Sequence, residues 1–414
     1  MTVALLKYYE RNQQKSQTKF MKTGYSIRTW RMRLVCPEPI WLARTEEYFQ
    51  NVVEFYYHLL RQHEELWNSS LFDIQRSLEL LTLTGRDGRQ PTNPLPMGKV
   101  PVYLRRAAIN KASATVKSTQ ELQSGFPEKL EAKVTFFKGM YSDLTDRSIC
   151  LKLWNGEKWI WTDCNLKGRP FPQDGQLMSP TLVKEGRRYL LNIPVKQENS
   201  DARTAKERMA EGTNLCSVRF TNTDTFAVCC ILDEQGKQLA VHTCRGGDAY
   251  RHRCKLLETR IQKSRPNTVG DNSPQPNRKY YMHLKNLSEH YAHQVSREIL
   301  NFCKENQAGI IVLPDYDQNF TRMAMVKSGN FSPLHLSSKI RTNLQYKAWA
   351  EGILVLETRT DGLKDKCAIC GGKVRRKGNE FLCENGHQGN RFLNDARNLG
   401  RKCQDSFFRV SRTK

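Results

Sequence analysis

The spacing of hydrophobic and polar positions changes several times along the chain, and the first regular pattern covers residues 26–35. Apolar side chains alternate there with polar or basic ones, which predicts a β-strand with one face in a core. We expect Arg28, Arg31 and Arg33 on the outer face of this strand. Such a row can lie along a phosphate backbone or simply face solvent.

A helical pattern follows this strand. In residues 41–66 the apolar side chains recur at helical spacing, and helical sequence continues to about residue 125. Short β-type runs return between residues 133 and 195, with Asn-Gly and Asp-Gly turn signals among them. A strand, a helical insert and further strands predict a β-barrel interrupted by a helical lobe.

The C-terminal half alternates strands with helices after a polar stretch, residues 197–212, that is typical of a linker. We expect three strands, a basic helix, a loop rich in Pro, Asn, Gly and Ser, a long helix and an apolar strand, at residues 215–220, 225–232, 238–244, 249–264, 265–278, 280–306 and 309–313. Short turns join the first three strands, so they add an antiparallel meander to an α/β sheet. The whole chain is therefore expected to be an α+β protein of several domains.

Composition indicates the class of partner. The 414 residues include 66 Lys and Arg against 42 Asp and Glu, a formal net charge of 66 − 42 = +24. A charge of this size favours a polyanion, and the dense phosphate charge of a nucleic acid fits it better than an anionic membrane surface. Residues 1–24 are themselves basic and expected to be flexible, with Met21 as an alternative start.

Neither export nor membrane insertion is expected. The sequence has no run of about 18 apolar residues and no charged start followed by an apolar stretch and a small-residue cleavage site. Its 13 cysteines are an odd number, many of them in apolar strings, which favours reduced thiols over a disulfide framework. We expect a cytoplasmic bacterial protein, associated with the nucleoid, with no membrane partner.

One group of cysteines has the spacing of metal ligands. Cys367 and Cys370 form a Cys-x2-Cys pair, and Cys383 with His387 forms a second pair after twelve residues, each beside turn residues. Two short turns joined by a hairpin bring four such ligands into the tetrahedron that Zn²⁺ prefers. Since protein fills all four positions, the sequence predicts a structural zinc ribbon over residues 363–390, with reduced surface cysteines as the alternative.

Several motifs, in order, resemble those of the transposon-encoded TnpB proteins and the miniature type V CRISPR effectors, which are RNA-guided DNA endonucleases. The resemblance covers nearly the whole chain and is carried by IRTWRMRLV (27–35), MGKVPVYL (97–104), LxxxYAHQVSREI (287–299), YKAWAEGI (346–353) and NRFLNDARNL (390–399). It implies a wedge-type β-barrel interrupted by a helical recognition lobe, followed by a RuvC-like domain of RNase H fold with an inserted zinc ribbon.

The domains that the resemblance implies are a basic flexible N-terminus, a barrel in two pieces, a helical recognition lobe, a linker and the RuvC-like domain with its ribbon, at residues 1–24, 25–37 with 126–196, 38–125, 197–212 and 213–414. Within the lobe and the basic helix, further basic side chains are candidates for nucleic-acid contact: Arg105, Arg106, Lys111, Arg251, Arg253 and Arg260. For Arg105 and Arg106, an ordinary surface role is the alternative.

In that family three carboxylates hold two Mg²⁺ ions, which stabilise the attacking and leaving oxygens of a phosphodiester. The first position carries Arg219 or Phe220 in this chain, depending on the alignment, and the second carries Pro314. The third carries Phe392. The resemblance is therefore to the nuclease-dead branch, such as TnpB-like repressors or dead miniature type V effectors, with no catalytic residue and no catalytic Mg²⁺.

By this resemblance the protein is expected to be an RNA-guided DNA-binding protein and not an enzyme. A guide RNA would select the target by base pairing, and the protein would read a short flanking motif on double-stranded DNA. Transcription would be regulated by blocking a promoter, with a partner in the transcription machinery or a second copy of the chain as further candidates.

Three alternatives stay open at this point. Asp224, Asp315 and Asp395 could form a rearranged active nuclease site, although Asp315 follows Pro314 on a strand and so points to the opposite face. The zinc ribbon and the basic strands could instead recognise DNA without a guide. A guided scaffold that recruits a transcription or transposition partner would differ from a repressor only in what it binds.

Overall fold

The computed structural model describes residues 24–411 except Arg86, Gln173, Ser200 and the segments 265–276 and 317–332. The chain divides into two compact units, Ile27–Gln197 and Glu198–Lys414 together with Met1–Ser26, called here the N-terminal and C-terminal units. Both units combine helices with sheets, so the predicted mixed α+β class is confirmed. The predicted flexible segment 1–24 and loop 265–278 lie almost wholly outside the described residues.

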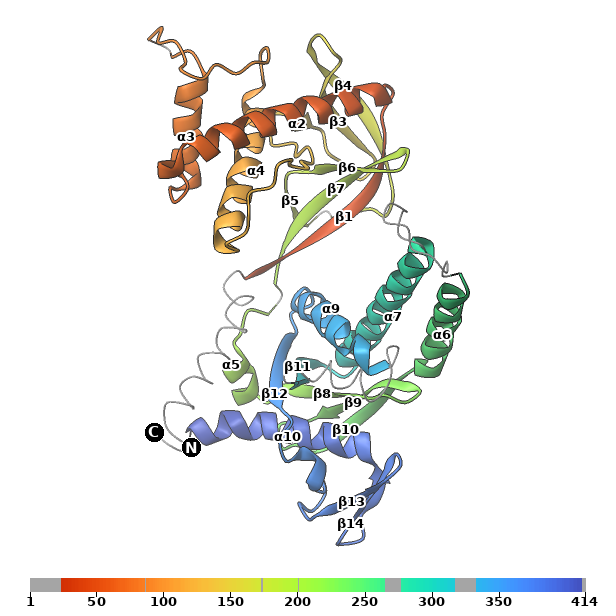
Figure 1. Cartoon of the computed structure of the whole chain (residues 1–414). Helices are drawn as coiled ribbons and strands as arrows, with labels where there is room; N and C mark the ends of the chain where they lie inside the picture. The colour runs from red at the N-terminus through yellow and green to blue at the C-terminus, as the bar shows by residue number, and fades with distance from the viewer. Residues whose placement is uncertain are drawn as a thin grey trace. The chain divides into compact units, whose positions relative to one another are not determined.

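The N-terminal unit contains a seven-stranded sheet and three α-helices within its described residues (Figure 1). Its elements are β1 (Tyr25–Val35), α2 (Pro39–Gln62), α3 (Leu71–Thr82), α4 (Val102–Glu121), β2 (Tyr141–Ser142), β3 (Ser148–Trp154), β4 (Trp159–Lys167), β5 (Gln176–Leu177), β6 (Thr181–Glu185) and β7 (Arg188–Glu198). The hydrogen-bonded order is β2-β3-β4-β1-β7-β5, and β6 pairs with β7. Closure of this sheet into the predicted barrel stays a prediction.

The helical insert forms because its apolar side chains recur every three to four residues, with Pro39 in the first turn of α2. Phe49, Val53 and Leu60 of α2 are buried, and α2 packs against α4, whose buried positions repeat at the same spacing. Thr45 joins α2 to the sheet, because its buried hydroxyl oxygen accepts a hydrogen bond from the backbone N–H of Trp154 at 2.9 Å.

The C-terminal unit is built on a five-stranded sheet of order β10-β9-β8-β11-β12. Its elements are α5 (Ala205–Ala210), β8 (Asn214–Phe220), β9 (Thr225–Leu232), β10 (Gln238–Arg245), α6 (Gly247–Lys263), α7 (Arg278–Glu305), β11 (Ala308–Asp315), α9 (Ser337–Trp349), β12 (Leu354–Arg359) and α10 (Arg391–Ser411). The predicted meander is confirmed, because β8, β9 and β10 pair antiparallel, whereas β11 pairs parallel with β8 and β12.

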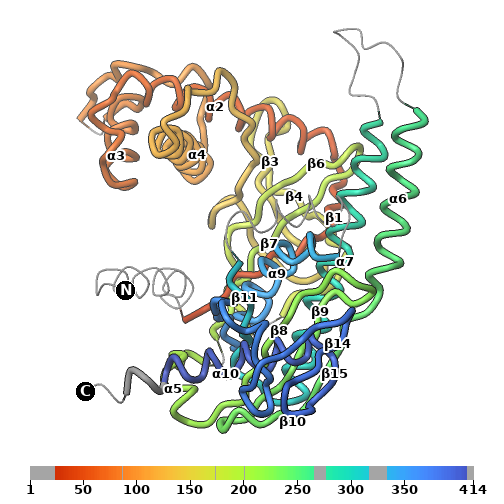
Figure 2. Tube along the Cα trace, turned by 60° about the horizontal axis from the view of Figure 1, so that its bottom comes forward, coloured from red at the N-terminus to blue at the C-terminus, as the bar shows by residue number. Residues whose placement is uncertain are grey.

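Helices cover both faces of this sheet (Figure 2). One core joins the sheet to α6, α7 and α9, and a second core on the other face joins it to α5 and α10. β9 is buried along almost its whole length, as a central strand covered on both faces should be. The alternation of side chains along β8 therefore decides which residues face α10.

A small three-stranded sheet precedes α10. Its strands are β13 (Val374–Lys377), β14 (Glu380–Cys383) and β15 (Gln388–Asn390), in the order β13-β14-β15. Its core contains only Cys367, Phe381 and Cys383, with Val374 packed against them. So small an apolar cluster is marginal by itself, and such modules are usually stabilised by a metal or a disulfide.

The predicted linker 197–212 contains the helix α5. Thr204 and Glu207 form a capping box at its start, a signal that is present in the sequence. Arg208 is fully buried, and its guanidinium donates hydrogen bonds to the carbonyl oxygens of Gly309 at 2.7 Å and Gly352 at 2.6 Å. This segment therefore differs from a solvated linker, because a buried arginine ties it to the C-terminal unit.

Across the residues that the structure describes, no helix is long and apolar enough to cross a membrane. All thirteen cysteines are free, and most of them are buried.

Candidate functional site

The four residues of the predicted zinc site lie together in the small sheet. One donor atom from each of Cys367, Cys370, Cys383 and His387 lies within 4.8 Å of the other three. The Sγ atoms of Cys370 and Cys383 are 3.3 Å apart. The side chains thus converge from the segment before β13, from the end of β14 and from the turn that follows it.

Hydrogen bonds favour the thiolate of Cys370, whereas burial and the neighbouring sulfurs raise the pKa of Cys383. The backbone N–H of Ile369 donates to Cys367 Sγ at 3.4 Å, and Asn385 donates to Cys370 Sγ at 3.3 Å. The hydrogen bond from Asn385, the backbone near Gly372 and the neighbouring Cys383 lower the pKa of Cys370 to about 6. A thiol with this pKa is mostly ionised at neutral pH, which is the form that binds a metal.

His387 completes the donor set. Its Nδ1 atom is buried and makes no hydrogen bond, although a buried ring nitrogen normally has a partner. A metal ion bound to the three cysteine thiolates and to His387 would occupy all four donor atoms of the cluster. The residues present therefore fit Zn²⁺, which takes tetrahedral sulfur and nitrogen ligands.

Side chains at the start of α10 hold the segment that contains Cys367 and Cys370. Asn394 is buried, and its side chain accepts from the backbone N–H of Ala368 at 2.7 Å and donates to the carbonyl of Lys366 at 2.8 Å. Asn398 also donates to the Lys366 carbonyl, at 2.8 Å. The NRFLNDARNL motif thus positions the cysteine cluster through these two asparagines.

The first predicted carboxylate position lies on β8. Ser217 faces α10, since its hydroxyl donates to the carbonyl of Ala396 at 2.6 Å, and Arg219 faces the same side. Phe220 lies on the opposite face, in the core that also contains Tyr250. Of the two alignments that the sequence left open, the structure places Arg219 toward the C-terminal helix.

Arg219 is held by two partners. Its Nε lies 3.3 Å from Oδ2 of Asp395 on α10, and its guanidinium donates to the hydroxyl of Tyr316 at 2.9 Å. Asp395 is 2% exposed, and its other oxygen lies 2.5 Å from the guanidinium of Arg376 on β13. One buried carboxylate therefore compensates two guanidinium groups, one from the sheet and one from the small hairpin.

The second position carries Pro314 at the end of β11. Its carbonyl oxygen accepts a hydrogen bond from Arg341 at 3.1 Å, and the same guanidinium lies 3.4 Å from the carboxylate of Glu357 on β12. Burial raises the pKa of Glu357, and Arg341 opposes this effect. Asp315, the last residue of β11, is exposed.

The third position carries Phe392 in the first turn of α10. Phe392 is 8% exposed, and the guanidinium of Arg391 lies 4.6 Å from its ring centroid. Burial lowers the pKa of Arg391, and the nearby Arg376 lowers it further. Positive groups therefore surround Asp395 at the place where the resemblance implies metal ligands.

The three aspartates of the rearranged-site alternative occupy different surroundings. Asp224 accepts from the backbone N–H of Asp248, Asp315 is exposed at the end of β11, and Asp395 is buried among arginines. Within the described ranges, two groups of three or more His, Cys, Asp or Glu side chains have donor atoms within 4.8 Å of one another. Neither group includes any of these aspartates.

Not all of the basic candidates of the N-terminal unit are available to a phosphate. On β1, Arg28 shares the face of the buried Met32, so its expected place on the outer face is wrong; the even positions of this strand point inward. Arg31 and Arg33 are exposed, and Arg31 forms an ion pair with Glu185.

On α4, Arg105 is also misassigned as a surface residue. It is 7% exposed and lies 3.0 Å from the carboxylate of Glu79 on α3, a contact within the core. Arg106 lies 3.3 Å from the same carboxylate but is half exposed, and Lys111 is exposed. Of the three basic candidates on this helix, Arg106 and Lys111 keep an exposed charge.

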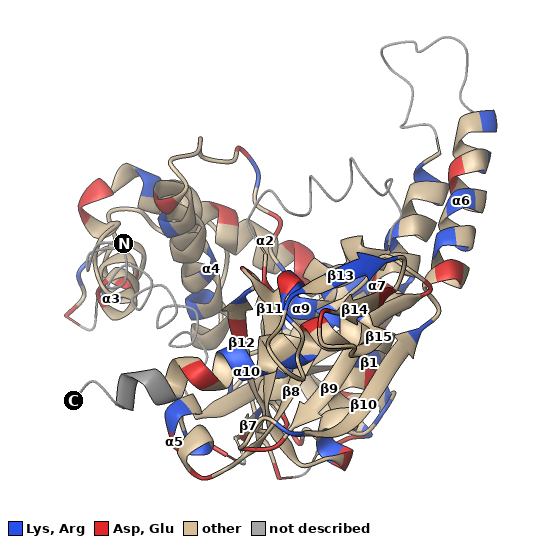
Figure 3. Cartoon of the chain, turned by 90° about the horizontal axis from the view of Figure 1, so that it is seen from below, with Lys and Arg blue, Asp and Glu red and all other residues tan. Residues whose placement is uncertain are grey.

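The basic candidates of the C-terminal unit lie on α6 (Figure 3). Arg251 lies 3.2 Å from Asp248 and donates to the carbonyl of Asn222. Arg253 and Arg260 line a shallow groove of about 440 Å³ between α6 and α7, whose apolar part includes Leu256. Figure 3 also shows Lys and Arg along β13, where Arg376 is already engaged with Asp395.

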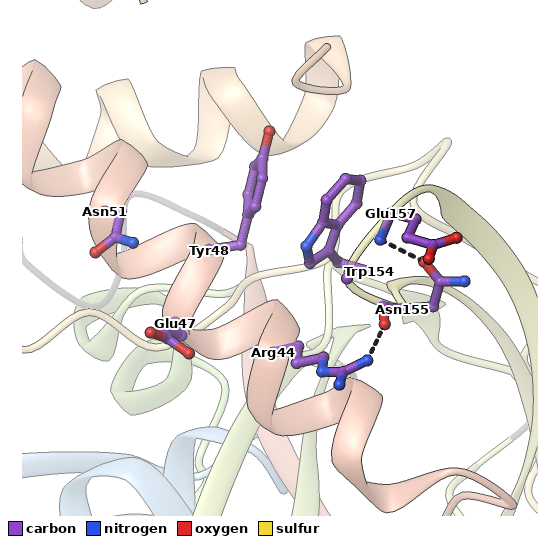
Figure 4. Close-up of a pocket in the computed structure, with 8 residues that line it drawn as sticks. Arg44, Glu47, Tyr48, Asn51, Trp154, Asn155 and Glu157 are labelled. Atoms are coloured by element: carbon purple, nitrogen blue, oxygen red, sulfur yellow. Dashed lines mark hydrogen bonds between the residues drawn. The ribbon is translucent and has the colours of Figure 1, made fainter. Parts of the chain in front are cut away.

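The sequence analysis missed one pocket of the N-terminal unit (Figure 4). It has a volume of about 490 Å³ and lies between α2 and the turn from β3 to β4. Tyr48 and Trp154 contact each other with ring centroids 5.0 Å apart, and Trp159 lies 5.2 Å from Tyr48. Arg44, Glu47 and Asn51 add polar groups from α2.

Aromatic faces beside hydrogen-bonding groups are the composition of sites that stack an unpaired base. Tyr48 and Trp159 also contact the MGKVPVYL segment, since their side chains donate to the carbonyls of Gly98 at 3.5 Å and Lys99 at 3.2 Å. An Asn-Gly turn between two tryptophans was the one sequence signal for this pocket, but only the fold brings α2 beside it.

Comparisons with known proteins place the fold. The Aq_aa04 family model matches residues 26–155. No curated protein matches the sequence. The Cas12f1 protein of a Cas12f1–sgRNA–target DNA complex is similar, with a TM-score of 0.54 and 12% identity over 87% of this chain and 81% of that chain.

A second solved structure, the mini-RNA-guided endonuclease CRISPR-Cas_phi3, is also similar. Its TM-score is 0.52 at 10% identity, over 95% of this chain and 97% of that chain. At such identities the likeness concerns the fold, and it extends over both units.

Proposed function

We propose that this chain is an RNA-guided DNA-binding protein of the TnpB and miniature type V kind whose RuvC-like domain does not cut DNA. The fold likeness to a Cas12f1–sgRNA–target DNA complex and to an RNA-guided endonuclease supports guided binding. The net charge of +24 supports a nucleic-acid partner, because neutralised phosphates release their counterions.

The ion pair between Arg219 and Asp395 carries the proposal that cleavage is absent. Two Mg²⁺ ions need several carboxylate oxygens that face one point. Both oxygens of Asp395 already face guanidinium groups, at 3.3 Å from Arg219 and 2.5 Å from Arg376. A guanidinium keeps its proton in proteins, so its charge repels a divalent cation at this point.

Zn²⁺ at Cys367, Cys370, Cys383 and His387 is part of the proposal. In the zinc-bound form this cluster would fix the hairpin and thereby hold Arg376 against Asp395. The zinc would therefore act structurally, with all four ligands from protein and no open position for a substrate.

A cleavage assay tests the absence of nuclease activity. The protein, purified with its RNA, is incubated with Mg²⁺ and a supercoiled plasmid that contains the matching target. We expect a stable gel shift and no nicked or linear product. If the protein cuts the plasmid, and Asp315→Ala abolishes the cleavage but the exposed control Asp405→Ala does not, a rearranged active site is identified instead.

The guide is tested by expressing the protein with its native flanking DNA, purifying it through high salt and sequencing the RNA that remains bound. A discrete structured RNA that ends in a guide segment is expected. Only bulk cellular RNA, together with tight sequence-specific DNA binding by the RNA-free protein, would favour direct recognition through the hairpin and the basic strands.

Regulation by promoter blocking belongs to the same proposal. A protein that stays on uncut DNA excludes RNA polymerase, so a reporter with the target inside its promoter should be repressed. Recruitment of a transcription or transposition partner is the second candidate, and it predicts a protein that copurifies at stoichiometric amounts. Light scattering of the RNA-bound form distinguishes a monomer from a homodimer.

A further inference from the structure

A second group of side chains that can bind a metal lies on the five-stranded sheet of the C-terminal unit, on the face opposite α10. His242 and Cys244 on β10 and Glu298 on α7 have donor atoms that all lie within 4.8 Å of one another. None of them belongs to the cysteine cluster of the hairpin or to the positions around Asp395. The proposed function leaves this group without a role.

Local structure explains why the three side chains meet. Residues i and i+2 of a strand point to the same face, so His242 and Cys244 both face α7. Cys244 is fully buried in the core between sheet and helices, while the side chains of His242 and Glu298 are about one third exposed. The group therefore has a buried sulfur at its base and an opening to solvent at its rim.

The existing contacts leave room for an ion after a small change. His242 Nε2 lies 2.7 Å from a carboxylate oxygen of Glu298, which is a hydrogen-bond distance. Two ligands at about 2.1 Å from a tetrahedral ion lie about 3.4 Å apart. An ion that replaces the shared proton therefore needs these two atoms to separate by well under 1 Å, which rotation of the partly exposed Glu298 side chain provides.

The charges also balance. A neutral imidazole, a thiolate and a carboxylate together carry −2, so a divalent cation gives a site with no net charge, which suits a half-buried position. A cysteine binds a metal as its thiolate, so the Cys244 thiol must lose its proton. Metal binding therefore releases this proton to solvent.

We propose that His242, Cys244 and Glu298 bind a divalent ion of the Zn²⁺ class, with water as the fourth ligand at the open side. The mixture of nitrogen, sulfur and oxygen donors favours zinc over Mg²⁺ or Ca²⁺, which prefer oxygen ligands alone. Since β10 is an edge strand of the sheet, the ion would fasten this edge to α7.

Metal content tests the site in the full chain. The protein is purified, dialysed against ZnCl₂, passed through a desalting column and measured for zinc per chain by mass spectrometry. Wild type is expected to hold two equivalents, and both His242→Gln and Glu298→Gln are expected to hold one. The controls His252→Gln on α6 and Glu305→Gln on α7 are exposed and should keep two.

The two zinc sites are separated by Cys383→Ser. This variant should retain the equivalent bound by His242, Cys244 and Glu298, and the double variant with His242→Gln should hold none. A wild type with one equivalent that Cys383→Ser removes overturns the second site and leaves the hairpin site intact. Two equivalents that persist in His242→Gln overturn it as well, and circular dichroism of each variant shows that it is folded.

Discussion

Two regions of the C-terminal unit differ in the side chains that they offer to a metal: the cysteine cluster of the hairpin, and the positions on β8, β11 and α10 where the resemblance implies carboxylates. At the hairpin, all four predicted ligands are present and their donor atoms converge within 4.8 Å. At the carboxylate positions, Arg219, Pro314 and Phe392 stand instead, and a buried aspartate faces two guanidinium groups. The three elements that carry these positions, β8, β11 and α10, are nevertheless all present.

This difference shows which of the two regions needs metal ligands in order to fold. A small hairpin with a core of three residues depends on its ligands, whereas a covered five-stranded sheet has enough apolar packing to fold without a metal. In the second region, Arg219 and Arg376 both pair with the buried carboxylate of Asp395. Arg376 belongs to β13, so the two sites are coupled.

The largest effect should follow from loss of a hairpin ligand. Zinc binding to such donor sets contributes about 10 kcal/mol of local folding free energy, so Cys383→Ser should unfold the hairpin and abolish its zinc. Limited proteolysis between residues 366 and 390, with zinc content, measures this. Cys150→Ser in the N-terminal unit is the control, and equal protease resistance in both variants would contradict a structural metal.

The second effect concerns the charge pair. Asp395→Asn leaves Arg219 and Arg376 without their buried carboxylate, and loss of one partner of a buried pair costs about 3–5 kcal/mol of unfolding free energy. Urea denaturation measures this loss, with exposed Asp405→Asn on the same helix as control. In a double-mutant cycle, Arg219→Met should restore part of the stability; a loss below about 1 kcal/mol in Asp395→Asn would mean the pair is unimportant.

The third prediction concerns a variant with carboxylates at the three positions on β8, β11 and α10. A variant with Arg219→Asp, Pro314→Glu and Phe392→Asp should gain a Mg²⁺ site, because acidic oxygens then replace the guanidinium and the ring. Mg²⁺ at ten times its dissociation constant stabilises by about 1.4 kcal/mol, so thermal unfolding should shift in the variant and not in wild type. An unchanged transition at 10 mM Mg²⁺ would show that these positions do not converge.

The smallest expected effect concerns a partly buried lysine whose hydrogen-bond partners are neutral. Lys347 on α9 donates to the carbonyl of His293 at 3.1 Å and the hydroxyl of Ser296 at 2.7 Å. Burial, with Arg297 nearby, lowers its pKa to about 8. The unfolded chain, with a Lys pKa of about 10.4, therefore binds more protons between these values, and the unfolding free energy rises with pH.

Lys347→Met should remove this rise and stabilise the protein by at most about 1 kcal/mol at pH 7, because the side chain is partly exposed and screened. Urea denaturation at pH 7.5 and 9.5 compares the variant with wild type. The control is Lys339→Met on the same helix, whose ammonium group instead forms an ion pair with Glu289 at 2.6 Å. An equal pH slope in wild type and Lys347→Met would refute the assignment.

Much of the fold follows from local spacing in the sequence. Period-two and helical patterns predicted β8 to β11, α6 and α7 within one or two residues, because such elements bury one face and this requirement is visible in each segment. The cysteine and histidine cluster was equally readable, since its ligands lie in two short pairs. The capping box at Thr204 is also visible in the sequence, but the polar stretch around it is typical of a linker.

Only the tertiary structure decided the partners of the charged residues. Arg105 is a surface residue by composition, yet Glu79 from another helix lies beside it in the core. Arg219 and Phe220 were equal candidates until the pleat placed Arg219 toward Asp395, 176 residues away. Periodicity is local, so a sequence contains it. The environment of a charge depends on segments that meet only after folding, and this environment determines whether an arginine contacts a phosphate or a carboxylate.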